Sequence, residues 1–154
     1  SMPYHHHQSI NTKSKRYIYK ELNHSQLEYT SMFHPFSKSD LYKNYRRNSF
    51  NIVPGGQSEN NFYLNDILIF DNSGSTLIHF AIENEMIFFH IISQLDYENF
   101  TELQKEFFLI QRKYNFGIFN DEENKLSNSI SNIKLDTNYS LPKDLIDFYH
   151  NNFR

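Results

Sequence analysis

Two histidines, His79 and His90, are the side chains whose chemistry is best suited to catalysis. Imidazole titrates near neutral pH, so two neighbouring rings could serve as acid and base, or bind a metal ion with a third ligand. They could equally stay neutral and only form hydrogen bonds. On an extended chain their face is otherwise apolar, with Leu77, Ala81, Phe88 and Ile92. The sequence therefore favours a structural role, and we predict no catalytic residue, no metal and no cofactor.

No motif with a known reaction chemistry occurs in the chain. The G-x-S-x-G elbow, the H-E-x-x-H zinc helix, the phosphate-binding P-loop and the G-x-G-x-x-G dinucleotide loop are all absent. Cysteine is absent too, which excludes disulfides, thiolate metal sites and cysteine nucleophiles. We therefore predict a binding protein more strongly than an enzyme.

Charge is divided unevenly along the chain. Residues 1–60 hold eight Lys and Arg against four Asp and Glu, whereas residues 61–154 hold seven against fourteen. The acidic half favours a basic protein partner, and we assign its binding to Glu83, Glu85, Asp121, Glu122 and Glu123. The alternative is that the two halves cancel each other's charge when they fold together.

The basic half supports a different function. Its cations alternate with aromatic residues, and the candidates are Arg16, Tyr17, Lys43, Arg46 and Arg47. Cations contact phosphates and aromatic rings stack on unpaired bases, so this half suits RNA or single-stranded nucleic acid, in a binding protein or a small nuclease. An isoelectric point near 6.2 is low for such a protein, so this remains the alternative.

Length and local composition indicate the organisation and the compartment. With 154 residues the chain fits one domain, and we expect residues 15–154 to form it behind a flexible tail at 1–14, where Ser1 resembles a cleavage scar. The abundant residues Phe, Tyr, Ile, Asn and Lys are encoded by codons rich in A and T, which indicates an AT-rich genome. The longest apolar run, Met86–Ile92, is too short to span a membrane, and the polar start lacks a signal peptide. We expect a cytoplasmic protein.

The segments that carry the two histidines resemble a β-meander. Ile67–Phe70, Thr76–Ile82 and Met86–Ile92 are apolar runs of strand length, separated by turn residues. A two-residue loop at 83–84 or at 84–85 places six large residues on one face: Ile78, Phe80, Ile82, Ile87, Phe89 and Ile91. The second of these loops sets His79 opposite His90.

Helices are predicted in the C-terminal half. Apolar residues spaced three and four apart indicate a helix over Phe100–Tyr114, capped by Asn99 or Thr101, and Pro142 near a first turn indicates another over Leu141–Asn151. Lys125–Asp136 fits a helix or a strand, and Arg16–Leu22 alternates like a strand. The fold class we predict is α+β, an antiparallel meander packed on one face by helices.

Fold class and charge together predict the function. We expect a small, non-enzymatic, intracellular protein-binding module, of the immunity-protein or antitoxin kind that neutralises a basic toxin or nuclease. Such a module needs an exposed acidic surface and no reaction chemistry, and both features agree with the residues above.

Overall fold

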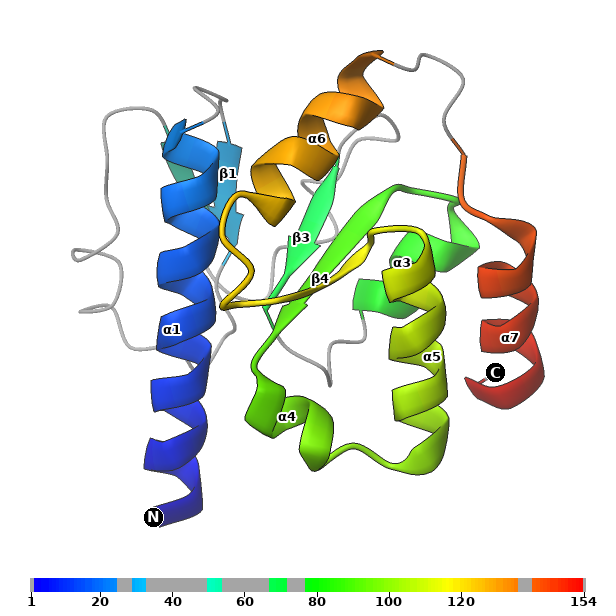
Figure 1. Ribbon diagram of the computed structural model, residues 1–154, viewed down its shortest axis with the longest axis horizontal. Coiled ribbons are helices and arrows are strands. Elements are labelled where there is room, and N and C mark those ends of the chain that lie inside the picture. Colours follow the sequence, from blue (N-terminus) through cyan, green and yellow to red (C-terminus); the bar gives the residue numbers. More distant parts are fainter. Residues whose placement is uncertain are drawn as a thin grey trace.

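The computed structural model describes residues 2–24, 29–32, 50–53, 67–71, 77–135 and 140–153, with side chains for 13–24, 67–71, 78–133 and 140–153. In this part of the chain, six helices accompany a three-stranded parallel sheet. A second parallel sheet pairs β1 (Tyr29–Met32) with β2 (Phe50–Val53). The three-stranded sheet lies between two groups of helices, as Figure 1 shows.

The three-stranded sheet has the order β3 (Leu68–Phe70), β4 (Phe88–Ile92), β5 (Gly117–Phe119), and both pairings are parallel. The central strand β4 is buried along its whole length. A strand covered by helices on both faces needs apolar residues at every position rather than at alternate ones. The composition of β4, in which His90 is the one polar residue among five buried positions, has this cause.

The predicted antiparallel meander is wrong. Strands do form at 68–70 and 88–92, but residues 77–83 form helix α3 (Leu77–Glu83), which connects two parallel strands. Ile78, Ala81 and Ile82 are buried, and their spacing is helical. The strand interpretation relied on the alternation of Ile78, Phe80 and Ile82. This short apolar segment therefore fits both the two-residue period of a strand and the 3.6-residue period of a helix.

The strand predicted at Arg16–Leu22 is also wrong, because these residues belong to helix α1 (Met2–His24). Tyr17, Ile18, Glu21 and Leu22 are buried at spacings typical of a helix and not of a strand. The helix begins at Met2, so residues 2–14 of the segment that we predicted as a tail have a helical backbone.

The remaining helices are α4 (Gln94–Glu98), α5 (Glu102–Lys113), α6 (Lys125–Leu135) and α7 (Lys143–Phe153). The helices predicted at 100–114 and 141–151 are confirmed, and α6 shows that residues 125–135 of the ambiguous segment form a helix. Thr101 is the N-cap of α5, and its hydroxyl accepts from the Gln104 N–H. Asn115, with φ of 64°, ends that helix in the left-handed region.

The helices form two layers around the sheet. Helix α1 packs on α6 and β4, whereas α5 packs on β5 and α7, and in Figure 1 the two groups lie on opposite sides of the strands. Helix α5 approaches β5 closely at Gly117, where a Cβ atom would lie 2.9 Å from Cε2 of Phe108. Within the described residues, no helix combines the length and hydrophobicity that a membrane span requires.

Candidate partner-binding surfaces

The two histidines are bonded to different helices. His79 is exposed on α3, and its Nδ1 lies 2.8 Å from the hydroxyl oxygen of Tyr149 on α7. His90 is buried in β4, with its Nδ1 3.0 Å from the amide oxygen of Gln111 on α5. Because an amide oxygen only accepts, this bond assigns the proton to Nδ1 of His90. The predicted cross-strand opposition of the two rings does not occur, because His79 lies on a helix.

A second polar contact joins the helices that carry His79 and Tyr149. Nδ1 of His150 on α7 lies 3.6 Å from Oε1 of Glu83, the last residue of α3. Burial, and then the nearby charge of Glu83, raise the pKa of the Tyr149 hydroxyl above its ordinary value. These contacts hold α7 against α3. Among the residues that the structure describes, no group of three or more His, Cys, Asp or Glu could hold a metal ion.

The carboxyl ends of the parallel strands are the usual ligand-binding edge of an open α/β sheet. Here Asp71, Ser93 and Asn120 directly follow β3, β4 and β5. Asp71 forms an ion pair with Lys15, and the Asn120 amide donates to the hydroxyl of Ser14 at 3.2 Å. Ser93 serves as the N-cap of α4. Both Lys15 and Ser14 belong to α1, so this helix lies against the edge where a ligand would otherwise bind.

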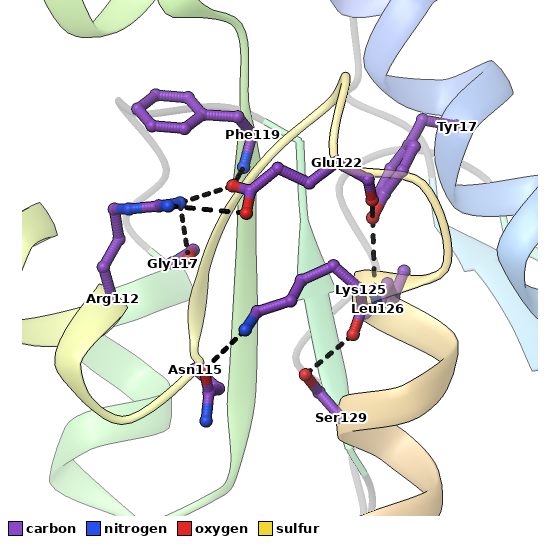
Figure 2. Close-up of polar contacts among 9 residues, drawn as sticks. All are labelled: Tyr17, Arg112, Asn115, Gly117, Phe119, Glu122, Lys125, Leu126 and Ser129. Atoms are coloured by element: carbon purple, nitrogen blue, oxygen red, sulfur yellow. Dashed lines mark hydrogen bonds and ion pairs between the residues drawn. The ribbon is translucent and has the colours of Figure 1, made fainter.

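Glu122, one of the predicted partner-binding carboxylates, is part of an internal network at the end of β5. The Arg112 guanidinium forms an ion pair with it, and the Phe119 N–H donates to its Oε1 at 2.9 Å (Figure 2). Burial by itself raises the pKa of this carboxyl, but the bonds from Arg112 and Phe119 outweigh burial and place the pKa below its ordinary value. Glu122 therefore stabilises the turn after β5 as a carboxylate.

The same turn is bonded to α1 through Tyr17. The tyrosine hydroxyl donates to the carbonyl oxygen of Glu122 at 2.6 Å and accepts from the Leu126 N–H at 3.2 Å (Figure 2). Glu21, also buried, accepts from the Ser127 N–H at 3.4 Å. These N–H groups belong to the first turn of α6, which has no intrahelical acceptor for them. Tyr17 is thus an internal anchor and not an exposed stacking platform.

The five predicted partner-binding carboxylates do not share one surface. Glu83 and Glu85 precede β4 at the amino ends of the strands, whereas Asp121, Glu122 and Glu123 follow β5 at the carboxyl ends. A strand of five residues separates these ends by roughly 16 Å. Glu123 also lies 3.8 Å from the ammonium group of Lys20 on α1. The acidic turn therefore faces the basic helix, as the alternative of mutual charge cancellation predicts.

The predicted nucleic-acid-binding residues are only partly placed. Arg16 is exposed on α1, on one face with Lys13 and Lys20, at spacings of three and four residues. Tyr17, the next residue along the helix, is buried. Lys43, Arg46 and Arg47 lie outside the described residues.

Sequence reasoning missed a third group of charges, on the outer layer formed by α5 and α7. Four carboxylates are exposed there: Glu102, Glu106, Asp144 and Asp147. A helical projection could have found the first two, because Glu102 and Glu106 lie on the face of α5 opposite the buried Gln111. Comparison of the chain with protein-family models, curated proteins and solved structures finds no match that would assign any of these surfaces.

Proposed function

We propose that this protein is a non-enzymatic protein-binding module that takes a basic partner on the layer formed by α5 and α7, in the manner of an immunity protein. The observation that carries the proposal is the state of the sheet's carboxyl edge. The side chains that follow the three strands there are engaged by α1 or by a helix cap. The edge that normally binds a substrate in this architecture is occupied by the protein's own helix.

The histidines support the same function. A general acid or base must reach a substrate proton, and it needs a further polar group beside it. His90 is buried against Gln111, and His79 is bonded to Tyr149, which also belongs to the contact between α3 and α7. Both rings therefore have a structural use.

The charge of the outer layer indicates the chemistry of the partner. Lys113 lies 3.5 Å from Asp144, and Lys105 lies 4.0 Å from Glu102, so cations of this layer already have carboxylates beside them. Glu106 and Asp147 add further exposed negative charge. The two helices together hold four Lys and Arg against four Asp and Glu, so it is the exposed carboxylates themselves, and not a net charge of the layer, that would attract basic groups of a partner.

The test is co-purification of the tagged protein from its native host, followed by titration with each recombinant candidate in a calorimeter. We expect a basic protein that binds with defined stoichiometry and loses affinity as salt rises. Treatment of the captured material with nuclease should not release this partner. Release by nuclease, or turnover of a substrate by the purified protein, would contradict the proposal.

A second candidate function is nucleic-acid binding, favoured by the exposed stripe of Lys13, Arg16 and Lys20 on α1. Its test is the fluorescence anisotropy of a labelled single-stranded RNA at two salt concentrations. If the stripe binds RNA, affinity falls steeply with salt, and the double variant Lys13→Glu, Arg16→Glu abolishes binding. Under the protein-binding proposal, no binding is measurable at physiological salt.

A further inference from the structure

The outer edge of β5 carries backbone groups that β4 does not use. In the described sheet β5 is an edge strand, with β4 as its neighbour. The carbonyl of Phe116 and the N–H of Asn120 bond to β4. Since successive residues of a strand direct their N–H and C=O groups to alternate sides, Gly117 and Phe119 direct theirs away from β4. A bare strand edge of this kind is a template for pairing with a strand of another molecule.

Three of these outward groups are bonded within the chain. The Arg112 guanidinium donates to the carbonyl oxygen of Gly117 at 3.3 Å, and the Phe119 N–H donates to Oε1 of Glu122 at 2.9 Å (Figure 2). The Glu122 N–H donates to the carbonyl oxygen of Phe119 at 3.1 Å. An ion pair joins the two side chains, Arg112 and Glu122. Together they satisfy groups that a further strand would otherwise satisfy.

The Arg112–Glu122 pair lies between the strand and solvent. All three residues of β5 are buried, whereas the side chains of Arg112 and Glu122 are 31% and 27% exposed. Gly117 leaves room for this cover, because a Cβ atom there would lie 3.1 Å from Cγ of Arg112. The guanidinium carbon of Arg112 also lies 4.5 Å from the ring centroid of Phe119. The edge is therefore closed by side chains that are themselves at the surface.

We propose that the Arg112–Glu122 pair is a guard that keeps the outer edge of β5 from pairing with the same edge of a second copy of the chain. The edge is complementary to itself. In an antiparallel pair, Gly117 of one copy would face Phe119 of the other, and each couple would exchange both of its N–H···O=C bonds. A two-fold axis would repeat the contact, as in other symmetric dimers. This inference is independent of the proposed function.

The first experiment removes the guard from the full chain. The double variant Arg112→Ala, Glu122→Ala leaves the outward groups of Gly117 and Phe119 without these side chains. In sedimentation velocity, we expect the parent protein to keep one sedimentation coefficient as its concentration rises. The double variant should shift to dimers and larger species.

Two control variants separate the guard from other effects. Tyr17→Phe weakens the same turn without uncovering the edge of β5, and it should sediment like the parent. Glu122→Gln removes the charge but retains an oxygen that can accept from the Phe119 N–H, so it should also sediment like the parent.

The second experiment locates the contact. The chain contains no cysteine, so one introduced cysteine gives a single attachment point for a pyrene label. In the double variant, a label at Asp121→Cys, directly beside β5, should show excimer fluorescence. A label at Asn151→Cys, exposed on α7, should show none.

Three results would overturn the proposal. One is a double variant that is folded and sediments like the parent. Another is association that Tyr17→Phe shows equally, or excimers at both label sites, since either would indicate a general loss of stability. The third is excimer fluorescence from Asp121→Cys in the otherwise unchanged chain, because the edge would then pair with its guard in place. If the double variant does not fold, Glu122→Ala alone takes its place, with the same outcomes for and against.

Discussion

The two helical layers hold to the sheet by different chemistry. On one side, α1 is attached to α6 and to the turn after β5 by buried hydrogen bonds from Tyr17 and Glu21. On the other side, α5 and α7 pack through aromatic rings. The ring centroid of Phe107 lies 6.1 Å from that of Phe148 and 5.3 Å from that of Phe153. A buried hydrogen bond requires one particular placement of the helix relative to its partner. Contacts between aromatic rings bury apolar surface and tolerate a wider range of distances and angles.

This difference explains which layer has side chains to offer a partner. In the layer of α1 and α6, Tyr17 and Glu21 point inward, because the first turn of α6 needs acceptors and the turn after β5 needs donors. Among the described side chains of this layer, only the cations Lys13, Arg16 and Lys20 of α1 form an exposed stripe. The layer of α5 and α7 satisfies its attachment with Phe107 and Phe108, and it leaves leucines and carboxylates on its outer face. Four predictions test this contrast.

The largest effect should come from the aromatic contact between α5 and α7. Phe107→Ala should lower the free energy of unfolding by about 3–5 kcal/mol, because it leaves a cavity among the rings of Phe148, Tyr149 and Phe153. Urea denaturation measures this loss. The control Leu109→Ala, exposed on the same helix, should cost no more than about 0.5 kcal/mol. Similar losses in both variants would contradict the arrangement of α5.

The next effect tests how closely α5 approaches the sheet. Gly117→Ala should cost about 1–3 kcal/mol, because its Cβ would meet Phe108 at 2.9 Å and Arg112 at 3.1 Å. Ile118 follows it in β5 and points to the opposite face, so Ile118→Val only removes a methyl group and should cost about 0.5–1.5 kcal/mol. Thermal unfolding of the two variants gives the comparison, and a Gly117→Ala protein as stable as the parent would refute the close approach.

A matched pair of tyrosines compares the polar contacts of the two layers. Tyr17→Phe should cost about 1–3 kcal/mol, because the Leu126 N–H and the Glu122 carbonyl lose their buried partner. Tyr149→Phe removes only a bond to the exposed His79, so it should cost less than about 1 kcal/mol. Chemical denaturation at neutral pH measures both. The reverse order would mean that the network around Tyr17 is not the stronger attachment.

The smallest effect is the pH dependence of the turn after β5. Because the pKa of Glu122 is depressed in the folded protein, its contribution is fully present above the ordinary carboxyl pKa of about 4.3 and is lost as pH falls through the lower, folded-state pKa. Glu122→Gln should therefore lose less stability than the parent between neutral and acidic pH. Glu123→Gln, exposed beside it, should keep the parent's pH profile. Identical profiles for the two variants would exclude this role for Glu122.

Helical segments with several turns were predictable because their period repeats. The stripe that includes Phe107 and Ile110 spans more than three turns, and α5 forms there. The segment at 77–83 is too short to distinguish a period of two from one of 3.6, so the prediction followed the wrong pattern. Large apolar residues occupy both faces of β4, at Phe88, Phe89, Ile91 and Ile92, and this was a usable signal for a parallel strand buried on both faces that the parity argument overlooked.

The candidate sites were harder to predict than the elements. Glu122 and Glu123 are neighbours in sequence, yet one is bonded to Arg112 and the other lies beside Lys20 on the surface. Tyr17 and Arg16 are neighbours too, and the helix turns one inward and the other outward. Composition places such residues in one group, whereas direction along a helix or turn separates them.

By itself, the sequence determined the absence of cysteine chemistry, the uneven charge of the two halves, and the helices α5 and α7, because each depends only on residue type or on a local period. Tertiary structure alone decided that the strands run parallel, that α1 lies against their carboxyl ends, and that Glu83 and Glu123 end on opposite edges of the sheet. The physical reason is the range of the interactions. Helical periodicity is set within a few residues, whereas strand direction and burial depend on which distant segments cover both faces of the sheet.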